Sequence, residues 1–382
     1  MKKKRKVIII GTAHPFRGGG ISTFNERLAK AFQDFGDDVT IYNFTLQYPK
    51  LLFPGKFQKT DEPKPEGIKI LNKINSINPL NWYLVGNEIK KTKPDLVVFR
   101  YWIPFMAPCF GTIARRIKKN KYTQIIAITD NVIPHEKKPL DKPLSRYFIK
   151  GMHGFIAMSR SVLNDLKSFD KKKPKIYNPH PLYDNYGEAI DKNTARKNLN
   201  WDADKKHILF FGFVREYKGL DLLIKALADE RLINSNIQVH VAGEFYSNPE
   251  KYQKLVEELE LDNKVLMPNE FIPNSDIPNY FSAADLLVQP YKSATQSGVT
   301  QVATHFNKPM IITDVGGLSE FVPHGKTGFV VKPDPQEIAN AIIDFFAGNY
   351  EERFVRNIGF EKTKYSWETM IDSINKIIYN IL

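Results

Sequence analysis

Residues 212–220 read Gly212-Phe213-Val214-Arg215-Glu216-Tyr217-Lys218-Gly219-Leu220, and this stretch decides the fold of the chain. It follows the apolar run 208–211 and precedes a helical pattern at 222–227. A buried strand, a glycine turn and a helix are typical of a parallel α/β sheet, which binds ligands at the carboxyl ends of its strands. Because Arg215 and Lys218 fall in that turn, we expect them to bind a phosphate group, with a solvated basic turn as the alternative.

Five further motifs follow in the second half of the sequence, and each contains a strand or helix pattern with a turn. They are 237–244, 284–291, 297–303, 309–320 and 325–335. Their order resembles the nucleotide-sugar-binding domain of retaining glycosyltransferases of the GT-B fold, family four (group 1) type. The resemblance covers about residues 205 to 335. A weaker counterpart in the first half is Gly18-Gly19-Gly20, which follows the apolar strand 7–10.

The resemblance implies an α/β protein of the GT-B fold, in which two Rossmann-like, doubly wound parallel-sheet domains face a central cleft. Apolar runs such as 95–100 and 124–128 have the near-continuous pattern of parallel strands that are buried on both faces. The polar, proline-containing stretch 177–206 indicates the domain junction. We expect an acceptor-side domain at 1–184, a donor domain at 185–362, and a C-terminal helix at 363–382 that crosses back to the first domain.

The composition limits the classes of function. The 382 residues suit two domains. The single cysteine, Cys109, cannot form an internal disulfide and fits a cytoplasmic location. The net charge of +13 calls for an anionic partner or another reason, and the candidate partners are a nucleic acid, a phosphorylated substrate and an anionic membrane. We see no zinc spacing or RNA-binding signature, so we expect no nucleic acid, while peripheral contact with the inner face of the cell membrane stays open.

The family uses two glutamates, separated by seven residues, around the donor sugar and ribose. The corresponding stretch here has no carboxylate and reads Ala294-Thr295-Gln296-Ser297-Gly298-Val299-Thr300-Gln301-Val302. We expect this neutral turn to hold the donor, because the backbone N–H groups that open a helix at Ser297-Gly298-Val299 can bind phosphate. The side chains of Gln296, Thr300 and Gln301 would then recognise hydroxyl groups. Thr295 completes the expected site.

Other residues are assigned to the donor site by the resemblance. They are Gly212, Glu244 and Glu320, together with the glycine turn Gly18, Gly19 and Gly20 of the first domain. Glu320 matches an acidic position of the family, although it could equally be a carboxylate that caps a helix. The glycine turn precedes a helix and could bind an anion, with an ordinary tight turn as the alternative.

Two candidates for contact with the transferred sugar follow the strand 124–128. Many relatives have a histidine directly after that strand, but Asp130 occupies this position here and His135 comes five residues later. Either side chain could hydrogen-bond the sugar, and His135 could instead be a structural loop residue. The spacing does not choose between them.

Two further patterns have structural and functional interpretations. Asp202-Ala203-Asp204 has the spacing of the metal-binding carboxylates of the other large glycosyltransferase fold, but it precedes its strand, so we interpret it as a solvated turn and expect no metal and no cofactor.

Aromatic residues gather at 44–57 and 78–85, and they include Trp82 and Tyr83. Such rings could stack on an acceptor sugar, touch lipid, or simply pack.

The resemblance implies a hexosyltransferase that moves a sugar, with retention, from a nucleotide-diphosphate-sugar to a glycan or lipid-linked acceptor in bacterial surface polysaccharide or glycoconjugate synthesis. Arg215 and Lys218 would neutralise charge on the leaving diphosphate. A non-catalytic GT-B-like subunit is one alternative, supported by the missing glutamates. A nicotinamide-dependent dehydrogenase is another, but the turn Gly11-Thr12-Ala13 lacks the glycine fingerprint that it needs.

Overall fold

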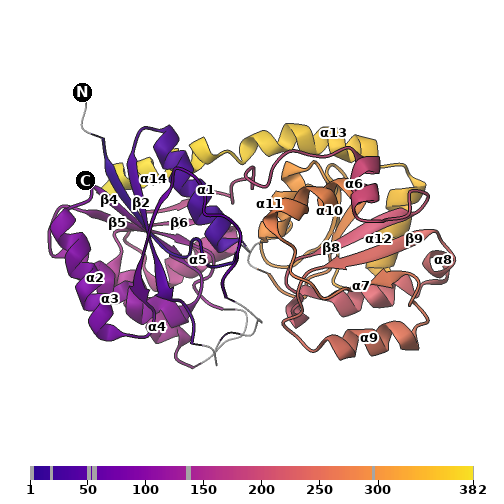
Figure 1. The fold of residues 1–382 in the computed structure, drawn as a ribbon, viewed down its shortest axis with the longest axis horizontal. Helices are drawn as coiled ribbons and strands as arrows, with labels where there is room; N and C mark the ends of the chain where they lie inside the picture. Colours follow the sequence, from indigo (N-terminus) through magenta and orange to yellow (C-terminus); the bar gives the residue numbers. More distant parts are fainter. Residues whose placement is uncertain are drawn as a thin grey trace. The chain divides into compact units, whose positions relative to one another are not determined.

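The structure is a computed structural model that describes residues 4–17, 20–49, 53, 58–134, 139–294 and 297–381. The chain divides into two compact units. Unit 1 consists of Met1–Pro181 and Tyr365–Leu382, and unit 2 consists of Leu182–Lys364. Each unit contains its own parallel sheet flanked by helices (Figure 1). His135, Gly18, Gly19, Thr295 and Gln296 lie outside the described residues.

Unit 1 contains a seven-stranded, fully parallel sheet in the order β3-β2-β1-β4-β5-β6-β7. Its strands are β1 (Lys6–Ile10), β2 (Asp38–Leu46), β3 (Lys69–Asn75), β4 (Leu96–Tyr101), β5 (Gln124–Thr129), β6 (Gly154–Ala157) and β7 (Lys175–Tyr177). The strand order reverses between β1 and β4. In open sheets of this kind, ligands bind beyond the carboxyl ends of the strands at such a reversal.

Helices of unit 1 pack on this sheet. They are α1 (Ile21–Asp34), α2 (Pro79–Thr92), α3 (Ala107–Lys118), α4 (Asp141–Gly151), α5 (Arg160–Phe169) and α14 (Trp367–Ile381), with the 3-10 turn η2 (Pro104–Met106). One hydrophobic core joins the sheet to α2, α3, α4 and α5. The last helix, α14, contacts α1 and β6. A Cβ atom on Gly154 would lie 2.5 Å from Ile377 Cγ2, so glycine allows this close packing of α14 on β6.

Unit 2 contains a six-stranded parallel sheet in the order β10-β9-β8-β11-β12-β13. Its strands are β8 (Lys206–Phe211), β9 (Ile237–Ala242), β10 (Val265–Leu266), β11 (Leu286–Gln289), β12 (Met310–Thr313) and β13 (Gly328–Val331). The order reverses between β8 and β11. The turn that follows β8 contains Arg215 and Lys218, so both cations follow a strand at the reversal.

Eight α-helices in the described part of unit 2 cover its sheet. They are α6 (Lys192–Asn198), α7 (Leu220–Leu227), α8 (Glu230–Ile233), α9 (Pro249–Glu258), α10 (Ile277–Ala283), α11 (Gly298–His305), α12 (Pro335–Ala347) and α13 (Glu351–Glu361). Three short 3-10 turns complete the unit: η3 (Glu216–Lys218), η4 (Asn274–Asp276) and η5 (Lys362–Lys364). A second hydrophobic core joins the sheet to α7, α9 and α12.

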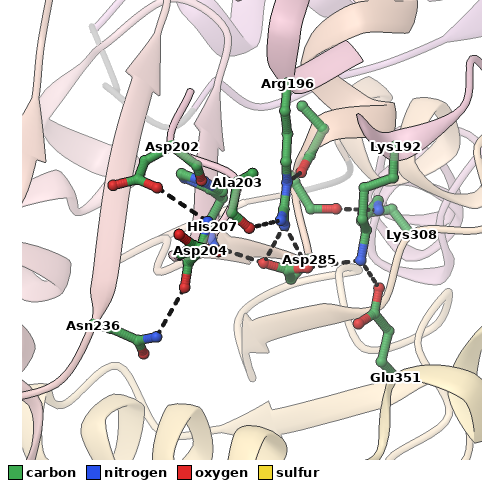
Figure 2. Close-up of polar contacts among 12 residues, drawn as sticks. Lys192, Arg196, Asp202, Ala203, Asp204, His207, Asn236, Asp285, Lys308 and Glu351 are labelled. Atoms are coloured by element: carbon green, nitrogen blue, oxygen red, sulfur yellow. Dashed lines mark hydrogen bonds and ion pairs between the residues drawn. The ribbon is translucent and has the colours of Figure 1, made fainter. Parts of the chain in front are cut away.

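A buried polar network around Asp285 fixes α6 to the amino end of the unit 2 sheet (Figure 2). Arg196 Nη2 donates to both carboxylate oxygens of Asp285 at 2.9 Å, and Lys192 Nζ donates to Oδ1 at 2.7 Å. The backbone N–H of His207 completes the set at 2.7 Å. Because Asp285 directly precedes β11 and is 2% exposed, this network is structural and lies at the opposite end of the strand from Gln289.

No helix within the described ranges combines the length and the apolar character that a membrane crossing requires.

Candidate functional site

The turn 212–219 lies at the carboxyl end of β8, and glycine is needed at both of its ends. Gly212 has φ +90° and Gly219 has φ +68°, in the left-handed region that other residues adopt rarely. A Cβ atom on Gly219 would also lie 1.9 Å from the carbonyl oxygen of Pro290, which follows β11. The turns after the two strands at the reversal therefore pack directly against each other.

The ammonium group of Lys218 is buried in this turn without a compensating anion. Lys218 is 7% exposed, and within the described part of the chain its Nζ atom has no hydrogen bond and no ion pair. A Cβ atom on Gly212 would lie 3.1 Å from Lys218 Nζ and 3.5 Å from Val299 Cγ2, so the glycine keeps space open beside both residues. Burial lowers the pKa of Lys218 below its ordinary value; the nearby Tyr217 opposes this shift and Arg215 adds to it. A buried cation of this kind favours a bound anion.

Arg215 lies in the same turn and supplies the second cation. Its guanidinium carbon is 5.1 Å from the ring centroid of Tyr246, and the side chain is half-buried. Like the ammonium group of Lys218, the guanidinium group of Arg215 forms no hydrogen bond or ion pair with any described residue; the two residues are joined only through the backbone, where the Lys218 N–H donates to the Arg215 carbonyl oxygen at 3.0 Å. A guanidinium that rests on an aromatic ring keeps its N–H groups available for a phosphate.

The first turn of α11 is held in place by Gln289, the last residue of β11. The Nε2 atom of Gln289 donates to Ser297 Oγ at 2.9 Å, and its Oε1 atom accepts from Thr300 Oγ1 at 2.9 Å. The Ser297 hydroxyl also lies 3.3 Å from the hydroxyl of Tyr291. The Ser297 side chain does not cap its own helix, so in the described part of the chain the N–H groups that open α11 have no side-chain cap from Ser297 and could donate to a bound anion.

Gln301 is the fourth residue of α11. Its side chain is fully buried, and neither its Nε2 nor its Oε1 atom has a hydrogen-bond partner within the described residues. Thr300 is also fully buried, and its hydroxyl is occupied by Gln289. Recognition of donor hydroxyls by these two side chains stays a prediction, and it would require a rearrangement at α11.

Three other residues predicted to bind the donor also follow strands of the unit 2 sheet: Gly298, Glu244 and Glu320. A Cβ atom on Gly298 would lie 3.0 Å from Tyr183 Cε2, so glycine allows α11 to begin against this ring. Glu244 is buried after β9, and its backbone oxygen accepts the N–H of Val214 at 2.9 Å. Glu320 is half-buried after β12. The roles of these residues at a donor stay predictions.

In unit 1, Asp130 is the first residue after β5 and forms a buried ion pair with Arg100. Arg100 Nη2 donates to Asp130 Oδ1 at 2.6 Å. The guanidinium carbon of Arg100 lies 3.7 Å from the ring centroid of Phe24 on α1. Gly20, the described member of the glycine turn, has φ +79° and directly precedes α1, which has no side-chain cap. Asp130 is therefore fixed in one position at this end of the sheet.

Sequence reasoning missed Arg100, Gln289 and Tyr291 as organisers of these two sites. The sequence does mark Arg100 and Gln289, because each is a polar residue near the end of an otherwise apolar strand. A buried polar group of this kind requires a partner, and the carboxyl end of a parallel strand is where such partners gather. Tyr291 carries no comparable signal in the sequence.

Within the residues that the structure describes, no three His, Cys, Asp or Glu side chains converge as metal ligands. Asp202 and Asp204 form a turn in which Asp202 Oδ1 accepts the N–H of Asp204 at 3.0 Å. The backbone oxygen of Asp202 accepts from His207 Nε2 at 2.6 Å, and that of Asp204 accepts from Asn236 Nδ2 at 3.1 Å (Figure 2). This geometry fits the interpretation of the pair as a turn.

Two family models match the chain in succession. The one described as "Glycosyltransferase Family 4" matches residues 18–179, and the one described as "Glycosyl transferases group 1" matches residues 191–359. Together these matches cover most of the chain. The protein belongs to the group 1, family 4 glycosyltransferases.

Curated relatives of this glycosyltransferase are distant. A D-inositol 3-phosphate glycosyltransferase of Pseudarthrobacter chlorophenolicus is 33% identical over 37% of the chain and 34% of the relative. A lipopolysaccharide 1,2-N-acetylglucosaminetransferase of Salmonella typhimurium is 27% identical over 50% of the chain and 52% of the relative. The chain thus matches only between a third and about half of the length of these relatives. An uncharacterised glycosyltransferase of Methanocaldococcus jannaschii is 23% identical over 97% of both chains.

Solved structures establish the fold of this glycosyltransferase. The sucrose-phosphate synthase of Thermosynechococcus elongatus aligns with a TM-score of 0.77 at 18% identity and covers 99% of both chains. The Anabaena protein HepE in complex with UDP-glucose aligns with a TM-score of 0.72 at 17% identity, over 98% of this chain and 99% of that one. The predicted fold class, α/β of the GT-B type with two Rossmann-like parallel-sheet domains, is confirmed.

Proposed function

We propose that this protein transfers a hexose-type sugar from a nucleotide-diphosphate-sugar donor to a hydroxyl group of an acceptor. The observation that carries the proposal is the buried ammonium of Lys218, which has no hydrogen bond or ion pair among the described residues and lies beside Gly212. A dianionic diphosphate would supply the missing countercharge, with Arg215 as a second, bidentate donor. The relative HepE has a structure in complex with UDP-glucose, which supports a donor of this class.

In the proposed reaction, the bond between the sugar anomeric carbon and the diphosphate oxygen breaks, and a bond from that carbon to the acceptor oxygen forms on the same face. The leaving phosphate takes the proton of the acceptor hydroxyl, so the protein supplies no nucleophile. Arg215 and Lys218 stabilise the negative charge that develops on the leaving group, and the N–H groups at the start of α11 add to this effect. The configuration of the sugar would be retained.

The acceptor that we propose is a glycan or a lipid-linked glycan of bacterial surface polysaccharide or glycoconjugate synthesis. Two observations support it: the net charge of +13, which suits an anionic surface, and the similarity to a lipopolysaccharide glycosyltransferase. We further propose that the enzyme acts in the cytoplasm, at the inner face of the membrane, and needs neither a cofactor nor a metal.

The test is a thermal-shift screen with nucleoside diphosphates and their sugars, followed by calorimetry and an assay of nucleoside diphosphate release. One donor should raise the melting temperature of the wild type and leave that of Lys218→Met unchanged. Lys225→Met, at an exposed position on α7, is the matched control and should respond like the wild type. If no nucleotide sugar binds, or if it binds equally to Lys218→Met, the proposal is wrong.

A non-catalytic GT-B-like subunit is the second candidate. The absence of carboxylates from 294–302 and the burial of Gln301 favour it. Calorimetry separates the two candidates, since a subunit that has lost donor binding gives no heat with any nucleotide sugar in the panel.

A further inference from the structure

The helices α2, α3 and α4 form one continuous layer on unit 1, and they lie side by side in Figure 1. Two glycines allow the close packing. A Cβ atom on Gly86 of α2 would lie 2.6 Å from Arg116 Cβ of α3, and one on Gly111 of α3 would lie 2.6 Å from the Tyr147 ring of α4. The outward side of these three helices is called the three-helix face below.

Exposed large apolar side chains are frequent in the part of the chain that contains these helices, and four of them lie on the helices themselves: Leu80, Tyr83 and Leu84 on α2, and Tyr147 on α4. Of the 11 large hydrophobic side chains that are exposed in the described residues, seven fall between 77 and 147. They are Ile77, Leu80, Tyr83, Leu84, Tyr122, Leu140 and Tyr147. Leu80 is 67% exposed and Leu84, one turn later on α2, is 58% exposed. Such a concentration marks an interaction surface, because exposed apolar residues are otherwise scattered singly.

Two arginines of α3 lie over the rings of Tyr83 and Tyr147. The guanidinium carbon of Arg116 is 4.0 Å from the ring centroid of Tyr83, and that of Arg115 is 3.7 Å from the ring centroid of Tyr147. Arg116 also donates to Asn87 Oδ1 at 2.8 Å through Nη2. These stacked pairs join α3 to its two neighbours and present positive charge beside the aromatic rings.

The charged residues of α3 and α4 are mostly basic, whereas α2 contains Lys90, Lys91 and one acidic residue, Glu88, which pairs with Lys73 at 3.2 Å. The six Lys and Arg residues of α3 and α4 are Arg115, Arg116, Lys118, Lys142, Arg146 and Lys150. In the described part of the chain, none of these side chains forms an ion pair. The helix α3 contains no acidic residue, and α4 contains only Asp141. Burial lowers the pKa of the neighbouring Lys173 to about 8; Asp170 opposes this shift, while Lys118, Lys175 and Arg115 add to it.

We propose that the three-helix face docks on an anionic lipid bilayer. Leu80 and Leu84 would enter the boundary between headgroups and acyl chains, as apolar side chains of interfacial helices do. Tyrosine and arginine side chains are suited to the headgroup region, because each has an apolar part that can face the acyl chains and a polar end that can stay in water. The unpaired lysines and arginines would bind lipid phosphates. An acidic protein could satisfy the cations but gives no reason for exposed leucines one turn apart.

This inference rests on the proposed function in one respect: a lipid-linked acceptor presents its reactive end at a bilayer surface. The docking itself requires neither donor nor catalysis. Vesicle binding can therefore be measured separately from donor binding by the same protein.

The experiment is co-sedimentation of the full chain with vesicles of phosphatidylcholine alone and of phosphatidylcholine with phosphatidylglycerol, in low and in high salt. One test variant carries Leu80→Ser and Leu84→Ser, and a second carries Arg146→Gln and Lys150→Gln. Matched controls in unit 2 are Leu266→Ser with Phe360→Ser, and Lys225→Gln with Lys254→Gln, all at exposed positions. Melting temperatures verify that each variant is folded.

The wild type should bind the anionic vesicles, bind phosphatidylcholine weakly, and lose binding in high salt. Each test variant should bind about tenfold more weakly, and each control should match the wild type. If the protein binds a donor but no vesicles, the docking inference is wrong and the proposed function stands. If it binds vesicles but no donor, the proposed function is wrong and the docking inference stands. If the leucine variant binds normally and soluble poly-aspartate competes fully, the face is a docking site for an acidic protein and the inference is wrong.

Discussion

Arg100 and Asp130 form an ion pair at 2.6 Å between two neighbouring strands of unit 1, where Arg100 is only 2% exposed. Arg100 is the fifth residue of β4, and Asp130 directly follows β5. The guanidinium is enclosed further by the ring of Phe24 and by Met158, to whose sulfur Nη1 donates at 3.4 Å. Asp130 is thus held rigidly at the end of the sheet where the family places a histidine.

Replacing only one residue of this ion pair should destabilise the protein. We expect Arg100→Met to lower the free energy of unfolding by about 3–5 kcal/mol, because it leaves a buried carboxylate without its cation. The double variant Arg100→Met with Asp130→Asn should regain most of that loss. Urea unfolding measures both. If the double variant is as unstable as Arg100→Met alone, packing rather than charge explains the effect.

Lys218→Met should separate stability from activity. Turnover should fall by about a hundredfold or more, the scale for the loss of one preorganised donor to the transition state, and Arg215→Ala should do the same. The melting temperature of Lys218→Met should stay the same or rise, because the wild type buries an unpaired ammonium at that position. Near-normal turnover in both variants would contradict the assignment of the two cations to the diphosphate.

Hydrophobic patterns predict the fold of this chain well because its sheets are parallel and covered on both faces. The apolar runs 95–100, 124–128 and 208–211 become β4, β5 and β8, whose interior residues are completely buried or nearly so. A strand buried on both faces must be apolar throughout, so its own residues report its environment. The turn at 212–219 can also be predicted from the sequence, because Gly212 and Gly219 adopt backbone angles that favour glycine.

Contacts between residues far apart in the sequence could not be predicted in the same way. The stretch 177–206, interpreted as a polar junction, contains α6, whose Arg196 meets Asp285 at a separation of 89 residues. Arg100 meets Asp130 across a separation of 30 residues. A polar residue shows that a partner is needed, but periodicity does not say which distant residue supplies it. Burial of the Gln301 amide without a hydrogen-bond partner in the described ranges runs against the usual rule for polar groups, so no sequence rule would predict it.

Gln301 provides a direct test of the neutral donor turn. Because both of its amide atoms are buried and have no hydrogen-bond partner among the described residues, Gln301→Met should keep or raise the melting temperature, whereas Gln301→Glu should lower it by stranding a charge. Donor affinity measured on the same variants decides the role of this residue. Unchanged affinity per folded molecule in Gln301→Met would exclude Gln301 from hydroxyl recognition.

Turnover should persist in excess chelator. The proposed site offers Arg215 and Lys218 where a metal ion would otherwise bind the diphosphate, and the Asp202 and Asp204 carboxylates lie in a turn before β8 rather than after a strand. Nucleoside diphosphate release measured with and without EDTA checks this expectation. Complete loss that manganese restores would show that a metal takes part and would reopen the question of its ligands.

Glu26 on α1 is the carboxyl group that should make stability depend on pH near neutrality. Its Oε1 atom accepts the backbone N–H of His14 at 2.7 Å, and His14 Nε2 donates to the backbone oxygen of Glu62 at 2.9 Å. Burial raises the pKa of Glu26 to about 7, a shift that the His14 N–H opposes and the Glu62 charge increases. The folded chain therefore binds this proton more tightly than the unfolded chain does.

It follows that the stabilisation from protonated Glu26 is fully present below pH 4.5, the ordinary value, and is lost as the pH rises through about 7. Glu26→Gln keeps an acceptor for the His14 N–H and does not titrate. The stability of the wild type relative to Glu26→Gln should therefore fall between pH 4 and pH 8, by up to about 3 kcal/mol. Asp34→Asn, at an exposed position on the same helix, should show no such trend. Urea unfolding across this pH range measures the difference, and parallel curves for the wild type and Glu26→Gln would show that Glu26 does not titrate in this window.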